Sequence, residues 1–441
     1  MKASFSKVTS LLSSIPLFSM RDMVWQYVAS LGVAIFGALF ILAAGRVLGP
    51  SEFGIYAIAA AVPTVVNSLF DYRIQEVSIV VLSENGAEED AARDVRSLFL
   101  FDLVSRIIAF IVSIPAGMLI LNALGFVVDP IVPLLAALVI FLAKVGNSLA
   151  VGVMRLSGNI QQYALLQSFD WAIRLAGGAA LYFFATVTIE STFLVQLPSA
   201  LLINLWTLVL ARRIAVRRYG SQVADRAGFR NLVEFFRSRS KLLLSSQSIS
   251  AVDTVVKELD TLICGIFLSA HNVAIYKITK SIAVMAWRCV DPVFVVILPN
   301  IAAYVADGRM DELSAIVKKA TIYLFLAAIA VFLGIWVISY PFTAYLLGPS
   351  YSDVPSIIPF MSIWIVVALP FVWTHSVAIA SGNAELQALS GMIGAVIGVV
   401  ALISGSASWS IYGAALGLSV AYSAYFVISY ILLKKKKIIT W

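Results

Sequence analysis

The chain has 441 residues, of which 61% are hydrophobic and 12% are charged, and it carries a formal net charge of +7. Soluble globular domains carry roughly 25% charged residues, so this composition excludes a soluble enzyme and indicates a protein that crosses a membrane many times. Each crossing takes about 20 predominantly apolar residues in a helix, because a bilayer leaves no water for unpaired backbone groups.

Apolar segments long enough to cross a bilayer follow one another along the whole chain. We expect an all-α polytopic membrane protein with about twelve transmembrane helices, at residues 23–45, 54–82, 98–121, 130–152, 163–186, 191–211, 242–268, 272–301, 319–339, 354–378, 387–405 and 410–433. The short connections between these segments leave no room for a soluble catalytic domain.

Most of the 31 lysines and arginines lie in connections on one side of the membrane. Cytoplasmic loops carry such an excess of basic residues, so we expect both termini in the cytoplasm. The longest basic stretch divides the helices six and six, which predicts an N-terminal lobe at 1–211, a basic cytoplasmic linker at 212–241 and a C-terminal lobe at 242–441. The positive charge therefore reflects topology, and nucleic-acid binding is not expected.

An internal repeat supports this division, because residues 45–71 align without gaps with residues 265–291. The identical positions are Gly45 and Gly265, Leu48 and Leu268, Ile55 and Ile275, Tyr56 and Tyr276, Ile58 and Ile278, and Asp71 and Asp291. Two halves that both start on the inner side imply a parallel repeat about an axis along the membrane normal. Transporters built in this way hold their substrate between the halves.

Eight basic residues lie inside the expected helices, where a charge costs at least about 2.5–3.5 kcal/mol at the bilayer centre. They are Arg73, Arg106, Lys144, Arg174, Lys257, Lys277, Lys280 and Arg288. Residues of this kind face a bundle interior or a hydrated cavity. So many cations in one bundle indicate a cavity for something anionic.

The alternative is that these cations pair with carboxylates and join helices together. Asp102 and Arg106 are four residues apart on one helix, and so are Asp170 and Arg174. Side chains at this spacing lie on the same helix face and can pair. Lys144, Lys257, Lys277 and Lys280 have fewer local partners, which favours the cavity for these four residues.

Four motifs carry a family resemblance. They are the turn from Arg46 to Tyr56, the stretch from Leu259 to Tyr276, the turn from Leu346 to Tyr351, and the segment from Tyr412 to Ala415. In order and spacing, these motifs resemble the polysaccharide-type (O-antigen) flippases of the multidrug/oligosaccharidyl-lipid/polysaccharide exporter superfamily. The repeat copy of the first motif lacks the arginine, so we assign Arg46 no role beyond capping a helix end.

The resemblance implies two six-helix lobes that form a V around a central cationic cavity. It also implies a flippase that moves an undecaprenyl-pyrophosphate-linked oligosaccharide, an O-antigen or similar surface-polysaccharide unit, from the cytoplasmic to the periplasmic leaflet. Transport would proceed by alternating access in the bacterial inner membrane. The implied partners are this lipid-linked substrate, membrane lipids, and polysaccharide polymerase and chain-length proteins.

Within this interpretation, the cations in the membrane bind the pyrophosphate. The expected substrate-binding residues are Lys257, Lys277, Lys280, Arg288, Arg73 and Lys144, and the carboxylates expected to couple transport to H⁺ or Na⁺ are Asp253, Glu258 and Asp260. Helical rise places Asp260 at the depth of Lys277 and Lys280, so an ion pair with either lysine is the alternative. Sugar hydroxyls would meet polar residues such as Asn147, Gln167, Asn204 or Gln247. No other cofactor is expected.

Three other functions remain open. An ion-coupled multidrug exporter would carry an organic cation, which unpaired cavity cations would repel. A membrane-embedded polysaccharide polymerase or ligase would need a large outer loop with arginines, and here Arg46 is the one basic residue of the outer segments. A peptidoglycan-precursor flippase usually has more helices. The sequence contains no nucleophile–base set, ATP-binding loop or cysteine–histidine metal cluster, so an enzyme is not expected.

Overall fold

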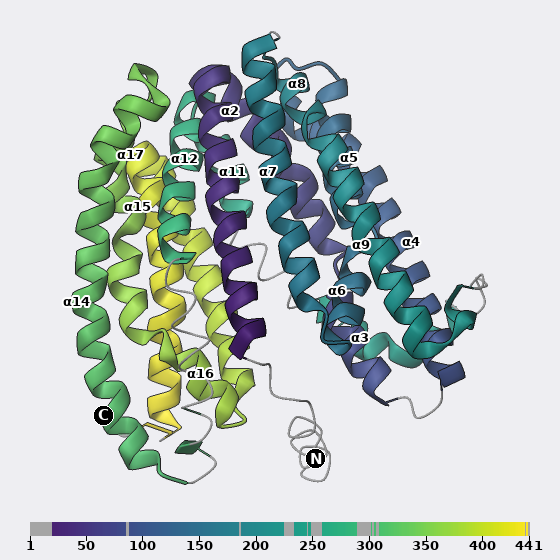
Figure 1. The fold of residues 1–441 in the computed structure, drawn as a ribbon. Coiled ribbons are helices and arrows are strands. Elements are labelled where there is room, and N and C mark those ends of the chain that lie inside the picture. Colours follow the sequence, from purple (N-terminus) through teal and green to yellow (C-terminus); the bar gives the residue numbers. More distant parts are fainter. Residues whose placement is uncertain are drawn as a thin grey trace.

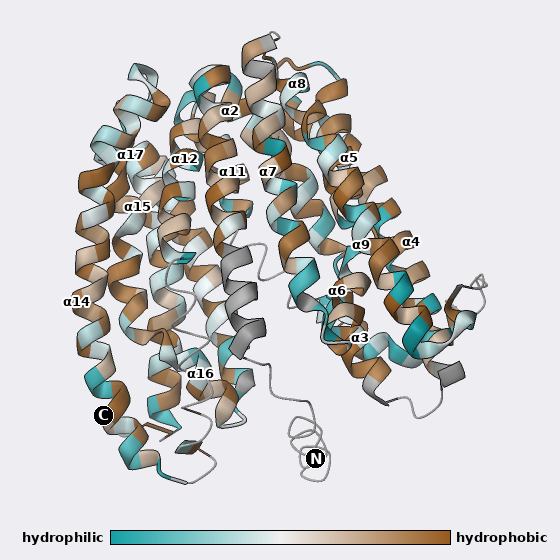
Figure 2. Ribbon diagram, in the orientation of Figure 1, coloured by the Kyte–Doolittle hydropathy of each residue, from teal (hydrophilic) through white to brown (hydrophobic). Residues whose placement is uncertain are grey.

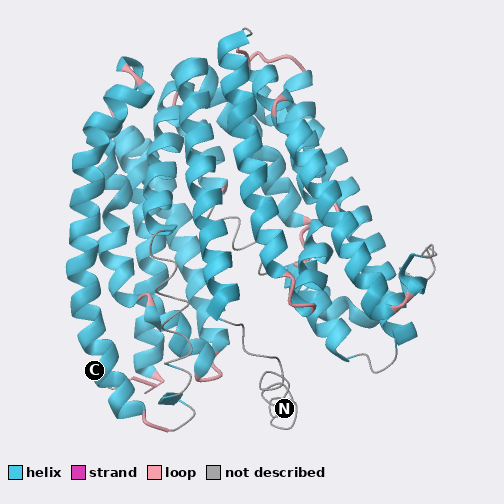
Figure 3. Ribbon diagram, in the orientation of Figure 1, coloured by secondary structure: helices cyan, strands magenta, loops and turns pink. Residues whose placement is uncertain are grey.

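The computed structural model describes residues 20–84, 88–184, 187–224, 233–244, 246–247, 258–288, 301, 304–305, 308–436 and 438–439. In this part of the chain, every regular element is a helix (Figure 3). The first half contains α2 (Met20–Leu69), α3 (Ile74–Glu84), α4 (Glu88–Ala123), α5 (Ile131–Lys144), α6 (Asn147–Leu156), α7 (Ile160–Phe184), α8 (Ile189–Leu194) and α9 (Gln196–Tyr219). The second half contains α11 (Leu259–Phe267), α12 (Ala270–Arg288), α14 (Met310–Phe342), α15 (Val354–Ala368), α16 (Trp373–Ala380) and α17 (Ala384–Lys435).

The helices are long and apolar enough for a multi-pass membrane protein. Seven stretches of the described residues satisfy the length and hydropathy of a membrane crossing. Two of them, Leu31–Leu82 and Glu385–Lys435, have 52 and 51 residues, which is about twice the length that one crossing needs. Together with α7 and α12, these stretches are consistent with the expected number of about twelve.

Sharp kinks divide the two longest helices where the sequence predicts helix boundaries. In α2 the kink is at Gly49, with φ 74° and ψ 165°, and Pro50 follows it. Glycine adopts a positive φ at little cost because it has no Cβ atom, and proline is favoured at the start of the next helical segment. In α17 the kink is at Ser410, with φ 54°. The breaks therefore lie between the expected crossings 23–45 and 54–82, and at the start of 410–433.

The helices form two lobes that approach each other at one end and spread apart at the other (Figure 1). Helices α3–α9 belong to one lobe and α11–α17 to the other, with α2 beside α12 between them. Helix α2 begins and α17 ends at the spread end, where hydrophilic residues of α4, α9 and α14 gather (Figure 2). We call this the basic end, because α9 and α17 carry arginines or lysines in their last turns there. The opposite end is called the closed end.

The expected basic linker differs in one respect from the structure. Helix α9 continues through four arginines to Tyr219, so the helix extends into the stretch that was predicted as linker. Residues 233–244 form a further helix, which overlaps the second part of that linker. Its Phe235 is buried while Val233 and Phe236 are exposed.

Two glycine contacts between the lobes are copies of each other. A Cβ atom on Gly45 would lie 2.9 Å from Cδ1 of Ile278, and a Cβ atom on Gly265 would lie 3.0 Å from Cδ1 of Ile58. In the sequence repeat, position 45 corresponds to 265 and position 58 to 278. Reciprocal contacts of this kind are what a two-fold axis produces. The repeated sequence is therefore also a repeat in three dimensions, and the axis passes between the lobes.

The closed end is held by polar contacts as well as by packing. Nη1 of Arg46 donates to the carbonyl oxygens of Tyr345, at 2.8 Å, and Leu346, at 3.2 Å. Both acceptors lie in the π-helical turn Thr343–Leu347 that follows α14. The hydroxyl of Tyr351 donates to the carbonyl oxygen of Gly45 at 2.7 Å. Arg46 thus joins the two lobes, a role that its sequence motif did not reveal.

Candidate functional site

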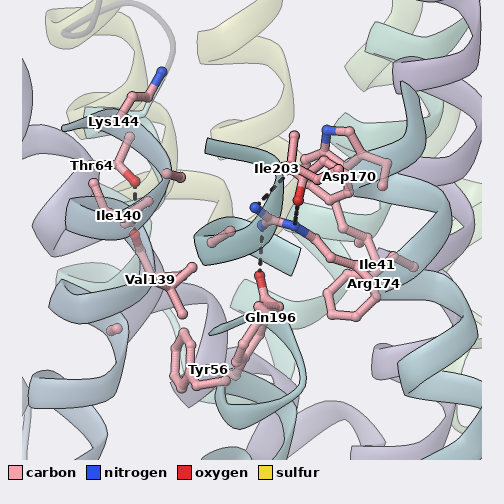
Figure 4. A pocket seen from close by; sticks show the side chains of 18 of the residues that line it. Ile41, Tyr56, Thr64, Val139, Ile140, Lys144, Asp170, Arg174, Gln196 and Ile203 are labelled. Atoms are coloured by element: carbon pink, nitrogen blue, oxygen red, sulfur yellow. Dashed lines mark hydrogen bonds and ion pairs between the residues drawn. The ribbon is translucent and has the colours of Figure 1, made fainter. Parts of the chain in front are cut away.

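A cavity of about 400 Å³ is lined mainly by the first lobe, on the side that meets the second lobe. Its walls come mainly from α2, α5, α7 and α9 (Figure 4). The second half of the chain contributes Glu258 and Lys277. The polar side chains among the described lining residues are Tyr56, Thr64, Lys144, Asn147, Tyr163, Gln167, Asp170, Arg174, Gln196, Asn204, Glu258 and Lys277. Three of these are cations and two are carboxylates, so the described lining carries a net positive charge.

Lys144 is the cation of this cavity that forms no ion pair with the described residues. It occupies the last turn of α5, its side chain is exposed, and it lines the cavity. Among the described residues, its ammonium group makes neither a hydrogen bond nor an ion pair, and in Figure 4 it points away from the bonded cluster of Arg174. An ammonium group in this position is available to an anion that enters the cavity.

Arg174 is fixed by a chain of hydrogen bonds. Its guanidinium group pairs with Asp170, one turn earlier on α7, at 2.8 and 3.1 Å. Nη1 of Arg174 also donates to Oε1 of Gln196 at 3.1 Å, and Nε2 of Gln196 donates to the hydroxyl of Tyr56 at 3.0 Å (Figure 4). The guanidinium group lies 4.9 Å from the ring centre of Trp171. The predicted pair of Asp170 and Arg174 is thus present, and it also forms part of the cavity wall.

Lys277 and Glu258 bring a second ion pair to the cavity from the other lobe. Nζ of Lys277 lies 3.2 Å from Oε2 of Glu258. Their side chains are 19% and 31% exposed, so the pair remains accessible from the cavity. An incoming anion can therefore compete with Glu258 for this ammonium group.

Lys280 forms an ion pair with Asp260, which was the alternative to cavity lining, and does not belong to the described lining of this cavity. Its ammonium group lies 2.7 Å from Oδ2 of Asp260, and the hydroxyl of Tyr276 donates to the same oxygen at 2.6 Å. Lys280 and Asp260 are 7% and 3% exposed. Helix packing buries Lys280 against a carboxylate, and its contact with the substrate stays a prediction.

A double variant separates the structural role of Lys280 from a direct role in binding. Lys280→Met alone should lower the free energy of unfolding by about 3–5 kcal/mol, because it leaves the Asp260 carboxylate buried and uncompensated. Lys280→Met combined with Asp260→Asn should regain most of that loss and keep transport activity. Unfolding in mixed micelles and a transport assay measure the two quantities. A stable double variant without transport would instead support the predicted contact between Lys280 and the substrate.

The buried tyrosines of the repeat each lie beside a charged pair, Tyr276 in direct contact and Tyr56 through Gln196. Tyr56 contacts the Gln196 amide that holds Arg174, and Tyr276 donates to Asp260 beside Lys280. The two lobes therefore place a tyrosine at the same repeat position against an acid–base cluster. In the first lobe this cluster lines the cavity, whereas in the second lobe it is closed off by packing.

Arg106 lies at the centre of a buried network outside the cavity. Its guanidinium group pairs with Asp102 at 3.3 Å and Asp71 at 3.2 Å. It also donates to Oδ1 of Asn67 at 2.9 Å and to the hydroxyl of Ser148 at 3.1 Å. The pair of Asp102 and Arg106 was predicted from their spacing. The contacts to Asn67 and Ser148 had no signal in the sequence, because they join α4 to α2 and α6.

The remaining predicted substrate residues lie elsewhere. Arg73 pairs with Glu76 at 2.5 Å on a partly exposed surface, and Arg288 ends α12, half-buried; neither belongs to the described lining of the cavity. Lys257 and Asp253 lie outside the described residues. The described part of the chain contains no group of three or more histidine, cysteine, aspartate or glutamate side chains that could hold a metal ion.

Most of the amide residues named from the sequence line the cavity. Asn147, Gln167 and Asn204 are among its lining residues. Oδ1 of Asn147 and Oδ1 of Asn204 are buried without a hydrogen-bond partner among the described residues. Gln247 instead donates to the carbonyl oxygen of Leu69 at 2.7 Å. The cavity wall thus offers amide groups beside its cations.

Solved structures with the same fold are transporters. The lipid II flippase MurJ in an inward closed conformation has a TM-score of 0.73 at 15% identity, over 93% of this chain and 87% of that chain. An inward-facing multidrug resistance MATE family transporter of the MOP superfamily has a TM-score of 0.61 at 16% identity, over 93% and 94%. The outward-facing conformation of such a transporter has a TM-score of 0.54 at 16% identity, over 94% and 95%.

Sequence comparison shows the family. No curated protein sequence matches this chain. Residues 19–305 match the family model described as polysaccharide biosynthesis protein. This match spans more than half of the chain, and the fold is the one shared by MurJ and the MATE transporters. The chain therefore belongs to the polysaccharide biosynthesis protein family, as a multi-pass membrane protein with a transporter fold.

Proposed function

We propose that this protein flips a polyprenyl-pyrophosphate-linked oligosaccharide, such as an O-antigen repeat unit, from the cytoplasmic to the periplasmic leaflet of a bacterial inner membrane. The observation that carries the proposal is the ammonium group of Lys144, which lines the cavity and forms no ion pair with the described residues. A pyrophosphate and a sugar chain cannot enter hydrocarbon alone. A cavity with an available cation lowers the cost of bringing them between the lobes, while the polyprenyl chain stays in lipid.

Three cations of the cavity have distinct parts in this proposal. Lys144 meets the pyrophosphate first, because no carboxylate forms an ion pair with it among the described residues. Lys277 also binds the pyrophosphate, which replaces Glu258 as the ion-pair partner of its ammonium group. Lysine suits a phosphate that must be released again, since it acts as a mobile point charge. Asp170 and Gln196 hold Arg174 in place, so Arg174 contributes a fixed positive charge to the cavity wall.

The closed end supports an alternating-access cycle that starts from the basic end. The contacts of Arg46 and Tyr351 hold the lobes together at the closed end. Helices α9 and α17 carry arginines and lysines in their last turns at the basic end, and cytoplasmic segments carry an excess of basic residues. We therefore assign the basic end to the cytoplasm, with both chain termini there, and the closed end to the periplasm.

Sugar recognition and ion coupling complete the proposal. The amide groups of Asn147, Gln167 and Asn204 would bind sugar hydroxyls. Glu258 is the coupling carboxylate that the cavity favours, because it is accessible there and is released when Lys277 binds phosphate. Asp253 and Asp260 remain the other candidates for H⁺ or Na⁺.

A second candidate is the flipping of lipid II, on the strength of the TM-score of 0.73 with MurJ. Both substrates would need a cationic cavity, so the assay must offer both. A multidrug exporter is disfavoured by Lys144, since an unneutralised ammonium group repels an organic cation.

Removal of single charges from the cavity tests the proposal. Lys144→Gln and Lys277→Gln should each weaken substrate binding roughly 10-fold to 150-fold, because a hydrogen bond to a charged group contributes about 1.5–3 kcal/mol. The measurement is the rate at which fluorescent lipid-linked oligosaccharide, or lipid II, becomes accessible outside proteoliposomes. Lys319→Gln serves as the control, since this exposed lysine lies on α14 away from the cavity. Unchanged flipping of both lipids by both variants would refute the assignment.

A further inference from the structure

A second, mainly apolar groove lies on the first lobe, separate from the central cavity. It has a volume of about 610 Å³ and is lined by α4, α6 and α9. Helices α6 and α9 form the wall between the two spaces: Asn147 and Asn204 face the cavity, whereas Leu149 and Leu205 line the groove. The floor of the groove is at Gly146, where a Cβ atom would lie 2.6 Å from Cδ2 of Leu208. The glycine therefore allows the helices to pack closely behind the groove.

The charges of the groove are all of one sign. Among its described lining residues, the two charged side chains are Arg96 and Arg212, and there is no carboxylate. Arg212 is exposed and makes no hydrogen bond or ion pair with the described part of the chain. The rest of the described lining is apolar, apart from Gly146. The groove thus has two positively charged side chains and an otherwise apolar lining.

The depth of these residues matches the profile of one membrane leaflet. Arg96 lies about 12 Å along α4 from its first residue and Arg212 about 10 Å along α9 from its last residue, by the helical rise of 1.5 Å per residue. Both helix ends are at the basic end (Figure 1). Leu205 lies about 10 Å deeper along α9 than Arg212. Arg96 and Arg212 are therefore at a similar depth, near the ends of the apolar parts of α4 and α9. The apolar part of the groove extends from there toward the middle of the bundle.

From this arrangement we infer that the groove binds one anionic phospholipid from the leaflet at the basic end. The lipid phosphate lies between the guanidinium groups of Arg96 and Arg212, and one acyl chain occupies the groove. Arginine binds phosphate through two parallel hydrogen bonds, and basic pockets between membrane helices bind anionic headgroups. The occupant is a phospholipid of the bulk membrane. The inference does not depend on the proposed flippase function, because the groove and the cavity are separate.

Lipid retention by the purified full chain tests the inference. The protein is incubated in detergent with equal amounts of phosphatidylglycerol and phosphatidylcholine, and native mass spectrometry counts each lipid per protein. We expect one retained phosphatidylglycerol, preferred over phosphatidylcholine. Arg212→Gln should reduce this preference about fivefold, the effect of one basic residue near an anionic surface. Leu205→Trp should displace the lipid by filling the groove, since Leu205 is 54% exposed and its replacement disturbs no buried core.

Matched controls come from the same helix. Arg213→Gln removes an exposed arginine next to the groove, and Leu202→Trp enlarges an exposed leucine that does not line it. Both controls should retain the lipid as the unchanged protein does. Equal retention by Arg212→Gln, or equal loss in Arg213→Gln, would overturn the inference. Retention of both lipids without preference would mean an adventitious lipid only, and recovery of a polyprenyl phosphate from the groove would overturn the choice of occupant.

Discussion

Gly54→Ala is expected to lower the population of the arrangement in which the lobes meet at the closed end, although it adds a single methyl group. A Cβ atom at Gly54 would lie 1.8 Å from the carbonyl oxygen of Ala270 and 2.5 Å from its carbonyl carbon. The obstacle is backbone, so no side chain can rotate out of the way. Overpacking costs about 1–3 kcal/mol or more, which lowers the population of the closed arrangement by a factor of roughly 5 to 150. Transport should fall by a similar factor, roughly 5-fold to 150-fold.

Spin labels on either side of the closed end measure this change directly. Ser51 on α2 and Ser350 after α14 are both exposed. In Gly54→Ala, the distribution of distances between nitroxides attached there should become broader and its mean should increase. Gly334→Ala is the first control, because nothing lies within 4 Å of its Cβ position. An alanine there should favour the helix by about 1 kcal/mol and leave transport unchanged.

A second control separates closure from folding. Gly413 approaches Gly405 within the second lobe, where a Cβ atom on Gly413 would lie 1.9 Å from the carbonyl oxygen of Gly405. Gly413→Ala should therefore destabilise the fold without altering the distance across the closed end in the folded fraction. If Gly54→Ala kept the short distance between the labels, the contact with Ala270 would not control closure.

Arg106→Met is expected to give the largest loss of stability, about 3–5 kcal/mol, because it leaves buried carboxylates without a counter-charge. Arg106 is 1% exposed, and its guanidinium group pairs with Asp102, which is also 1% exposed, and with Asp71. The hydrogen bonds to Asn67 and Ser148 are lost at the same time. Because this network joins α2, α4 and α6, most of the first lobe should loosen together.

The measurement is the free energy of unfolding in mixed micelles. Arg73→Gln is the matched control, since its ion pair with Glu76 has side chains that are 29% and 41% exposed, and exposed pairs contribute about 0–1 kcal/mol. Combining Arg106→Met with Asp102→Asn and Asp71→Asn should restore part of the stability by removing the unpaired charges. A loss of less than about 1 kcal/mol in Arg106→Met would contradict the view that this network holds the lobe together.

Local spacing predicted two of the ion pairs that form within one helix. Asp102 with Arg106, and Asp170 with Arg174, follow from the geometry of a single helical turn. Local spacing did not predict which residues pair between different helices. Asp260 was level with both Lys277 and Lys280, and the structure pairs it with Lys280 and leaves Lys277 to Glu258. Depth in the membrane is a local property, whereas the direction that a side chain faces depends on how the helices are rotated and packed.

The sequence by itself determined the helical class, an expected number of about twelve crossings, the boundary at Gly49 and Pro50 between the first two crossings, and the repeat that relates the lobes. These features depend on apolar length, on glycine and proline, and on basic residues near helix ends, all of which act within a few turns of the chain. The tertiary structure alone decided that Lys144 is available while Lys280 is neutralised, that Arg46 joins the lobes, and that Arg96 and Arg212 share one groove. Each of these depends on distances between segments far apart in the chain, and such distances are set only when the helices pack against one another.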